Sequence, residues 1–486
     1  MPSSQSQSCP PVPAWRQTAL IAWLVGVGVA WALYRKGRIL GFDPYYYCEY
    51  AKLYALRWPR AFGDDWPCGY PLLGGLLGRL GLPAYPALCL ISLLALAVLA
   101  GVAARMLAGL PGTRLVAVAL SVVPVVGVQL FGAFSELPFA AALLLVAAAL
   151  ATGAKPSAFW LAGAFAVLAF TFRYAGVIPI GVLWIWLIVQ RRTLRADGAL
   201  AAAAAACGVA TLTALALLGW NYAVTGYLTS PDHGSLGDGG VHFLPRNVAD
   251  MGWSLPSALM LGGLRSDGWL GRIVGWGLYL PVVLGLLWAW LRPRHSWVGP
   301  VALVALAYLG GMVLLRTISN FDRLFGPRMF LPAIFPLGLA AVGQLIPRWR
   351  RGVAAGCMLI LLLAGVAAVR GMSRELGGDV RPAAALLKGR LRPGDRVQIN
   401  TLAFSLSAYF AQPVEQAWPE YWEQNPVRRF LVIAARRVGR SGSPEPIDPA
   451  WQQLTARLVA SGSHRYLLRS AGLLVLERIE PAALPR

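Results

Sequence analysis

The sequence predicts an all-α polytopic membrane protein with about eleven transmembrane helices and a small C-terminal α/β domain outside the membrane. Of its 486 residues, 57% are hydrophobic and 13% are charged, against roughly 45–50% and roughly 25% in soluble proteins. The hydrophobic residues form uncharged runs of about 17–25 residues, the length that a helix needs to cross a bilayer core. This pattern excludes a soluble globular enzyme.

The predicted spans are the uncharged runs of the sequence. They cover residues 17–34, 80–104, 115–135, 137–154, 156–172, 174–190, 198–220, 273–291, 296–315, 329–347 and 352–369. Residues 1–16 are polar and Pro-rich and lack the basic start and cleavage site of a secretory signal. We expect them to be a disordered cytoplasmic tail, followed by a transmembrane domain over residues 17–370.

The charge of the connecting loops predicts the orientation of the chain. One alternate set of loops is strongly basic and carries a single acid, Asp197. Its twelve basic residues are Arg16, Arg105, Arg114, Lys155, Arg191, Arg192, Arg195, Arg292, Arg294, Arg348, Arg350 and Arg351. Because short basic loops stay in the cytoplasm, we expect a multi-pass protein of the cell (inner) membrane with a cytoplasmic N-terminus and an extracytoplasmic C-terminal domain.

The net charge of +22 is spread between the spans and along the C-terminal part of the chain. This distribution fits anionic lipid headgroups better than a nucleic acid. We therefore predict membrane lipids as partners and no nucleic acid.

Two predicted outer loops, residues 35–79 and 221–272, are long, whereas the other connections are short. Long loops commonly carry function. After the last span, residues 371–486 are richer in charge. They contain short β-type runs at 396–400, 430–434 and 472–476. This change predicts a small α/β domain on the outer face.

Asp43 lies a few residues beyond the first span, where a carboxylate is partly shielded from water. It could serve as a general base or bind a divalent metal. It could also cap a helix that begins at Pro44, because proline is favoured at the first helical position, and the two roles are compatible. Tyr46, in the same run, is a candidate substrate-binding residue.

The first outer loop continues with Asp64 and Asp65, which could bind a cation or a sugar hydroxyl or form a solvated turn. The segment that follows, Leu72–Leu80, is apolar, Gly-rich and too short to span. We expect it to lie along the membrane interface.

Glu136 and Arg173 each stand between two apolar runs, on the same predicted outer side. A charge in such a place is costly without a partner and is commonly functional. The two residues could pair as a structural bridge, or one or both could face a polar cavity that binds substrate.

Arg323 and Arg328 lie at the outer mouth of the span that begins at residue 329. Arginine suits phosphate because its planar fork donates two hydrogen bonds to two oxygens. Either side chain could instead extend to lipid headgroups.

Signatures of other enzyme classes are missing from the sequence. It contains no Walker sequence, no GxSxG elbow and no HExxH. The six cysteines fit none of the spaced metal-binding patterns. The cysteines therefore predict no zinc site, and the one cofactor that the sequence allows is a divalent metal, which Asp43 could bind.

Several short motifs together resemble the GT-C superfamily of membrane glycosyltransferases, which use polyprenyl-phosphate sugars as donors. They are Asp43 after the first span, Trp66-Pro-Cys-Gly-Tyr-Pro-Leu-Leu73, Ser135-Glu-Leu-Pro-Phe139, Phe172-Arg-Tyr-Ala-Gly176, Asn221-Tyr-Ala-Val-Thr-Gly226 and Pro327-Arg-Met-Phe-Leu-Pro332. Each is weak alone, but their order and spacing extend over about 330 residues. The resemblance implies a GT-C-like membrane domain.

The resemblance is to protein O-mannosyltransferases and aminoarabinose transferases in particular, and it implies that Asp43 lies at the reaction centre. Asp43-Pro-Tyr is also similar to the first-loop motif of the oligosaccharyltransferase catalytic subunit, which binds a divalent metal. The sequence has no WWDYG motif in its C-terminal part. This difference argues against transfer of whole oligosaccharides to asparagine.

The resemblance implies an inverting hexosyl- or pentosyltransferase that moves a sugar from a polyprenyl-phosphate donor to an acceptor hydroxyl at the outer membrane face. Asp43 would act as the base, and Arg173, Arg323 and Arg328 would bind the donor phosphate. The acceptor is a lipid, a glycan or a protein. The alternatives are a transporter or flippase of a lipid-linked sugar, or a non-catalytic scaffold.

The predicted topology can be tested with reporter fusions. After Arg374, a reporter enzyme that works only outside the cytoplasm should be active, and one that works only in the cytoplasm should be inactive. If the reporter that works only in the cytoplasm is active at that position, the predicted orientation is wrong and Asp43 lies on the cytoplasmic side.

Overall fold

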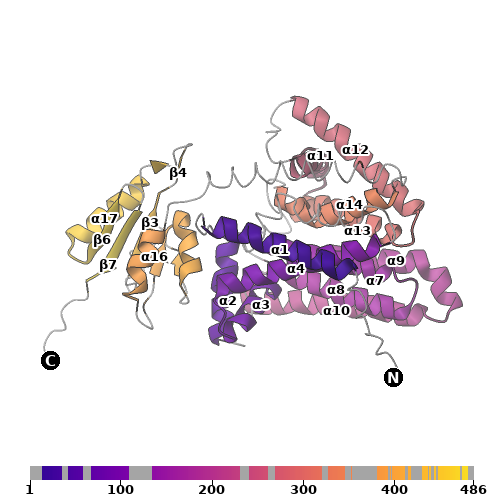
Figure 1. Ribbon diagram of the computed structural model, residues 1–486, viewed down its shortest axis with the longest axis horizontal. Helices are drawn as coiled ribbons and strands as arrows, with labels where there is room; N and C mark the ends of the chain where they lie inside the picture. Colours follow the sequence, from indigo (N-terminus) through magenta and orange to yellow (C-terminus); the bar gives the residue numbers. More distant parts are fainter. Residues whose placement is uncertain are drawn as a thin grey trace, which may run out of the picture.

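A computed structural model of the chain describes most of the membrane domain and of the C-terminal domain (Figure 1). The residues that it describes are 14–35, 42–57, 67–108, 134–229, 240–260, 269–319, 327–344, 352, 380–391, 395, 397–410, 414–416, 430–435, 437–438, 443–444, 447–470 and 473–479.

The membrane domain is a bundle of helices. They are α1 (Ala14–Arg35), α2 (Phe42–Arg57), α3 (Gly69–Arg79), α4 (Ala84–Met106), α7 (Glu136–Leu150), α8 (Pro156–Phe172), α9 (Val177–Ala196), α10 (Leu200–Thr225), α11 (Leu244–Met260), α12 (Trp269–Leu291), α13 (Val298–Ser319) and α14 (Leu331–Gln344), with the 3-10 helices η1 (Tyr174–Gly176), η3 (Val241–Phe243) and η4 (Pro327–Phe330).

Most of the predicted spans coincide with these helices. The runs 115–135 and 352–369 lie almost entirely outside the described residues. In the part of the chain that is described, four helical segments are long and apolar enough to cross a membrane, and shorter apolar helices accompany them. The four are Ala84–Met106, Tyr174–Ala196, Leu200–Thr225 and Val298–Ile318. The chain is thus a multi-pass helical membrane protein, and the count of eleven spans stays a prediction.

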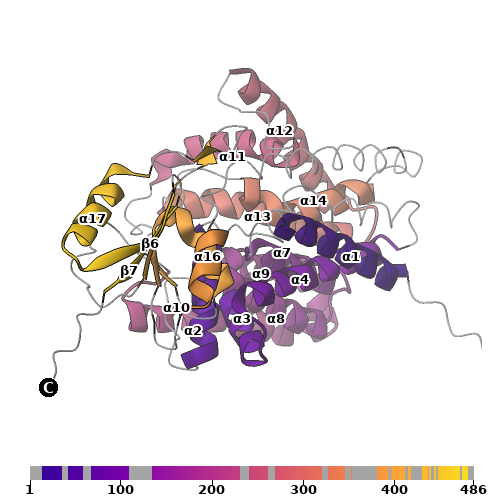
Figure 2. The same cartoon turned by 60° about the vertical axis from the view of Figure 1, so that its left-hand side comes forward.

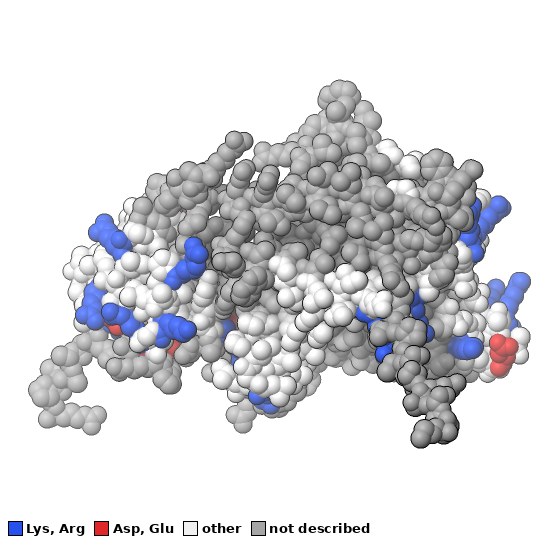
Figure 3. Space-filling view, in the orientation of Figure 1, with Lys and Arg blue, Asp and Glu red and all other residues white. Residues whose placement is uncertain are grey.

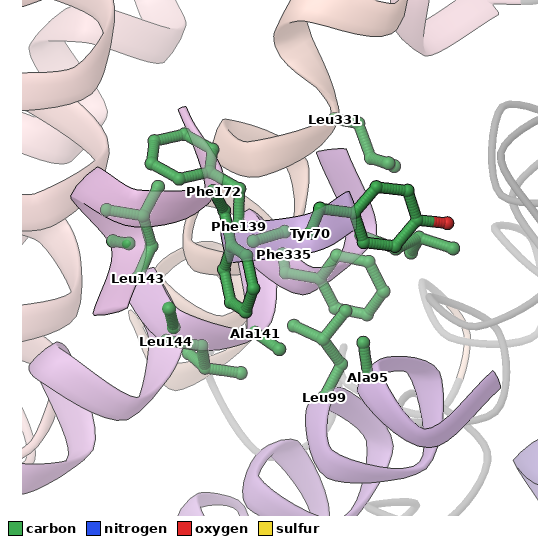
Figure 4. Packing of buried hydrophobic residues seen from close by; sticks show 14 of the residues in the cluster. Tyr70, Ala95, Leu99, Phe139, Ala141, Leu143, Leu144, Phe172, Leu331 and Phe335 are labelled. Atoms are coloured by element: carbon green, nitrogen blue, oxygen red, sulfur yellow. The ribbon is translucent and has the colours of Figure 1, made fainter. Parts of the chain in front are cut away.

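Helix α7 is the centre of the bundle. It packs against α4, α8 and α14, and nearly all of its side chains are buried. Figure 4 shows Phe139, Leu143 and Leu144 of α7 among side chains of α4 and α14. Its alanines allow close approach, which matters because packing, and not the hydrophobic effect, drives helix association in lipid.

Helices α2 and α3 form a hairpin inside the first predicted outer loop. A Cβ atom at Gly74 would lie 2.8 Å from a methyl of Leu88, and one at Gly75 would lie 2.6 Å from Cβ of Tyr54. These glycines therefore allow α3 to fit between α2 and α4. Most of the apolar segment Leu72–Leu80 thus forms the C-terminal part of α3 and packs against α2 and α4. Its predicted position along the membrane interface stays a prediction.

The C-terminal domain contains a five-stranded sheet with the strand order β2-β1-β3-β7-β6. Strand β1 is parallel to β2 and β3, whereas β7 is antiparallel to β3 and β6. Its elements are α16 (Arg381–Lys388), β1 (Val397–Ile399), η5 (Thr401–Tyr409), β2 (Val414–Gln416), β3 (Phe430–Ala434), β4 (Arg437–Val438), β5 (Ser443–Pro444), α17 (Pro449–Ala460), β6 (His464–Ser470) and β7 (Leu473–Arg478). The β-type runs of the sequence correspond to β1, β3 and β7.

The two faces of this sheet have different neighbours. Leu431, Ile433 and Leu476 pack on one face with Trp451 of α17. The opposite face belongs to the same hydrophobic cluster as the membrane domain. Figure 2 shows α17 on the side of the sheet away from α2. On this side η5 packs against α2 as well as against β3, so η5 joins the domain to the bundle.

Charged side chains gather at two ends of the described surface (Figure 3). On the face that is shown, several Lys and Arg side chains lie on the C-terminal domain at the left and others at the far end of the bundle at the right, with a few Asp and Glu side chains among them. Helix α9 ends in the basic sequence that includes Arg191, Arg192 and Arg195. Its end lies away from the C-terminal domain (Figure 1). This separation is what the predicted topology requires, since it assigns the two to opposite sides of the membrane.

The tight contact between α2 and α3 can be tested with two glycines. We expect Gly75→Ala to lower stability by about 1–3 kcal/mol, because its Cβ would overlap Tyr54 and the backbone of α2. Gly208→Ala, on α10 with open space around its Cβ position, should cause no loss. The measurement is thermal unfolding of the two purified variants in detergent. Equal melting temperatures would contradict the close contact between α2 and α3.

Candidate active site

Three elements bring together residues that are distant in sequence. Asp43 lies in the first turn of α2, Glu136 is the first residue of α7, and Arg173 directly follows α8. Helix α2 begins at Phe42, so Asp43 lies inside its first turn, one residue before the expected helix start at Pro44. An acid in this place is stabilised by the partial positive charge of the helix N-terminus.

Arg173 is positioned by a sharp reversal between α8 and α9. Its backbone is extended, with φ −153° and ψ 141°, and this ends α8. At Gly176, the last residue of η1, the chain passes so close to α8 that a Cβ atom would overlap backbone atoms of Phe170. Glycine permits this approach, which explains the end of the Phe172–Gly176 motif.

Glu136 and Arg173 form a buried ion pair. Glu136 Oε1 lies 2.8 Å from Arg173 Nη1, and the two side chains are 1% and 16% exposed. Arg173 Nη1 also donates to Ser135 Oγ at 3.3 Å. Loss of one partner of a buried pair costs about 3–5 kcal/mol, because the other charge is left uncompensated. The bridge that the sequence allowed is therefore formed.

Tyr47 connects α2 to this pair. Its hydroxyl lies 2.9 Å from Ser135 Oγ, and it follows Asp43 by one helical turn, on the same side of α2. Burial raises the pKa of Tyr47 above its ordinary value; the charge of Arg173 opposes this shift, and those of Asp43 and Glu136 add to it. Tyr47 is thus protonated at neutral pH and serves as a hydrogen-bonding group.

Asp43 is the accessible acid of this group. It interacts electrostatically with Tyr47 and Arg173, and it is partly exposed whereas Glu136 is buried. Of the two carboxylates, Asp43 is therefore the one with exposed surface. We refer to Asp43, Tyr47, Ser135, Glu136 and Arg173 as the Asp43 cluster.

Helix η4 lies next to the Asp43 cluster. Tyr308 of α13 donates to the carbonyl oxygen of Met329 at 2.8 Å, and Tyr308 also interacts electrostatically with Arg173. Arg328 precedes Met329 in η4. The structure thus brings the backbone of Arg328 to the same region, and the contact of its side chain with a donor phosphate stays a prediction.

The other predicted site residues lie elsewhere. Tyr46 donates to Gln416 Oε1 of the C-terminal domain at 3.2 Å, so it faces that domain. Asp64, Asp65 and Arg323 lie outside the described residues.

Several polar residues of this region were missed from sequence. Tyr47 and Ser135 adjoin the motifs that were noted, and Tyr308 is a polar residue within an apolar run. A second ion pair joins Nη1 of the buried Arg316 of α13 to Oδ2 of the partly exposed Asp250 of α11 at 3.0 Å. Its signal in sequence was weak, because both residues stand in predicted outer segments where isolated charges are common.

Asn221 explains another of the sequence motifs. Its side-chain amide donates to the carbonyl oxygens of Tyr227, Leu228 and Thr229 at 3.1–3.2 Å, after Gly226 has ended α10 with a positive φ of 80°. Tyr174, next to Arg173, also donates to Thr229 at 3.3 Å. The start of the second long loop is thereby tied to the turn that carries Arg173.

The described residues offer no group of three or more His, Cys, Asp or Glu side chains that could hold a metal ion. Within that part of the chain, Asp43 and Glu136 are the acids of the cluster. A divalent metal at Asp43 stays a prediction. Asp64 and Asp65 lie outside the described residues.

Comparison with known proteins gives a match in structure but none in sequence. No protein-family model matches the sequence, and no curated protein matches it significantly. The fold is similar to that of ArnT from Cupriavidus metallidurans bound to undecaprenyl phosphate, with a TM-score of 0.58, 16% identity, and coverage of 97% of this chain and 98% of ArnT. Apo ArnT gives a TM-score of 0.54 at 15% identity, over 96% of this chain and 97% of that one.

The fold is also similar to that of the archaeal oligosaccharyltransferase AglB from Archaeoglobus fulgidus, in complex with an inhibitory peptide and a dolichol-phosphate. The TM-score is 0.53 at 11% identity, and the match covers 94% of this chain and 80% of AglB. Both proteins are GT-C enzymes. The match to ArnT extends over nearly the whole chain, C-terminal domain included. The chain thus has the fold of ArnT and AglB, as the resemblance implied.

Proposed function

We propose that the chain is a GT-C-type glycosyltransferase that moves one sugar from a polyprenyl-phosphate donor to an acceptor hydroxyl at the outer membrane face. The observation that carries this proposal is the Asp43 cluster, in which a partly exposed carboxylate interacts electrostatically with the guanidinium of Arg173, within a fold shared with ArnT and AglB. The structures of those two proteins contain undecaprenyl phosphate and a dolichol-phosphate. A polyprenyl phosphate is therefore the donor class that we assign.

The choice of base follows from the three ionisable oxygen groups of the cluster. Glu136 is buried against Arg173 at 2.8 Å, and the raised pKa of Tyr47 keeps its hydroxyl protonated. Asp43 is partly exposed. Asp43 therefore accepts the proton of the acceptor hydroxyl as that oxygen attacks the anomeric carbon.

The reaction is a single displacement. The bond from the acceptor oxygen to the anomeric carbon forms as the bond from that carbon to the phosphate oxygen breaks, so the configuration inverts. The leaving polyprenyl phosphate carries its negative charge away and needs charge stabilisation more than a proton. Arg173 supplies part of this charge, and we assign the rest to Arg328 and Arg323.

The ion pair limits what Arg173 can do alone. Its charge is shared with Glu136, so the pair presents little net charge to a phosphate. Its remaining N–H groups can still donate to phosphate oxygens, since a guanidinium carries five. Glu136 thus holds Arg173 in place, and further positive charge at the phosphate comes from other arginines.

The role of Asp43 can be tested by kinetics. Asp43→Asn should lower turnover by about 10²–10⁴-fold and leave donor binding nearly intact, because a positioned base acts on the transition state. The matched control is Asp448→Asn, since Asp448 caps α17 in the C-terminal domain and Asn caps equally well. Wild-type turnover of folded Asp43→Asn would refute this mechanism, and would leave the transporter and scaffold alternatives.

The role of Arg173 can be separated from its structural role by a double variant. Arg173→Met should destabilise the protein by about 3–5 kcal/mol, because it leaves Glu136 buried without a counter-charge. Arg173→Met with Glu136→Gln removes both charges and should recover most of the stability. If Arg173 binds the donor, turnover and donor affinity should remain low in the stable double variant. Recovery of both with stability would show that the pair is only structural.

A further inference from the structure

Helix α2 carries a second buried polar network, one and a half turns beyond Asp43. Glu49 Oε1 accepts from Lys52 Nζ at 2.8 Å and from Ser407 Oγ at 2.5 Å. Lys52 Nζ also donates to Ser407 Oγ at 3.1 Å. Glu49 and Lys52 are 8% and 4% exposed, and Ser407, in η5 of the C-terminal domain, is 1% exposed. The C-terminal domain thus supplies part of the polar environment of a charged pair on α2.

The same helix binds the edge of the C-terminal sheet. Strand β2 is at the end of the strand order and pairs with β1 on its other side. At Val414, the backbone N–H donates to Glu49 Oε2 at 2.8 Å, and the carbonyl oxygen accepts from the Tyr45 hydroxyl at 2.6 Å. An exposed strand edge leaves such groups unpaired. Side chains of α2 therefore take the place of a further strand.

Consecutive tyrosines of α2 contact different parts of the protein. Tyr45 and Tyr46 donate to the C-terminal domain, whereas Tyr47 bonds to Ser135 at the start of α7. Helix α2 is consequently held between the sheet and the membrane bundle. Asp43 and Glu49 are six residues apart on this rigid helix, about 9 Å along its axis.

We propose that Glu49 is a positioning residue for the reaction, and that the C-terminal domain acts through it to fix where Asp43 lies. This inference rests on the proposed function. Stability alone is a poor reason for a buried ion pair, because apolar side chains of similar volume stabilise as well or better. A network with three directed hydrogen bonds to Glu49, however, fixes the rotation and the axial position of α2 against β2.

The catalytic consequence concerns turnover and not donor binding. The donor phosphate is assigned to arginines that lie outside α2, so a displaced α2 leaves its site in place. The distance from Asp43 to the acceptor hydroxyl would change, and a misplacement of about 1 Å can cost about 10²-fold in rate.

The test compares two buried glutamates: Glu49 of α2, which contacts the C-terminal domain, and Glu477, which lies inside that domain. Glu49→Gln keeps the shape of the side chain but removes the charge that Lys52, Ser407 and Val414 bind. The control is Glu477→Gln, because Glu477 is also buried and paired, with Arg465 at 2.8 Å, but lies on β7, away from β2. Glu49→Gln should lower kcat by about 10–100-fold with an unchanged KM for the donor, whereas Glu477→Gln should lower stability alone.

A second readout does not depend on the reaction. Hydrogen–deuterium exchange of the full chain in detergent should be faster over residues 42–57 in Glu49→Gln than in the wild type, and unchanged there in Glu477→Gln. If Glu49→Gln does not fold, Tyr45→Phe removes the hydroxyl that bonds to the Val414 carbonyl oxygen and should increase exchange over residues 42–57 to a smaller extent.

Two results would overturn the proposal. One is a Glu49→Gln variant whose kcat, corrected for folded protein, equals that of Glu477→Gln. The other is unchanged exchange over residues 42–57. If the wild type transfers no sugar at all, the proposed function fails, and the exchange measurement still decides whether the C-terminal domain fixes α2.

Discussion

The structure depends on how one short helix with buried polar groups is held. Helix α2 carries Asp43, Tyr47, Glu49 and Lys52, and each of the last three is buried. Buried polar groups are costly unless they are hydrogen-bonded, so α2 is stable only between partners that offer such bonds. The bundle offers Ser135 near Arg173, and the C-terminal domain offers Ser407 and Val414. The membrane domain, helix α2 and the C-terminal domain are therefore packed together.

Much of the fold was predictable because lipid imposes simple rules. Uncharged runs mark helices, and most of the predicted spans coincide with helices of the structure. The β-type runs found β1, β3 and β7, which are mostly apolar. Strand β2 has a single apolar residue, Val414, and β6 mixes His464 and Arg465 with apolar residues, so neither strand gave a clear signal. A sheet edge that pairs with side chains of α2 could not be predicted, because no local pattern encodes a contact across more than 360 residues.

The candidate site was predictable in part for a similar reason. Isolated charges next to apolar runs are rare, so Asp43, Glu136 and Arg173 stood out, and the structure brings them together. The sequence could not decide whether Glu136 and Arg173 pair, because that depends on the reversal at Gly176. Tyr46 was selected for its place beside Asp43 but faces Gln416, since neighbouring residues of a helix point in different directions. Tyr47, one turn from Asp43, is the tyrosine that reaches the cluster.

The central claim is that this chain transfers a sugar from a polyprenyl phosphate and needs Asp43 to do so. The most direct measurement is mass spectrometry of the lipid and glycan fractions from cells that lack the gene, carry it, or carry the Asp43→Asn variant at equal protein level. We expect a species heavier by one sugar in cells with the wild-type gene and its absence in the other two. Identical fractions from all three would contradict the account.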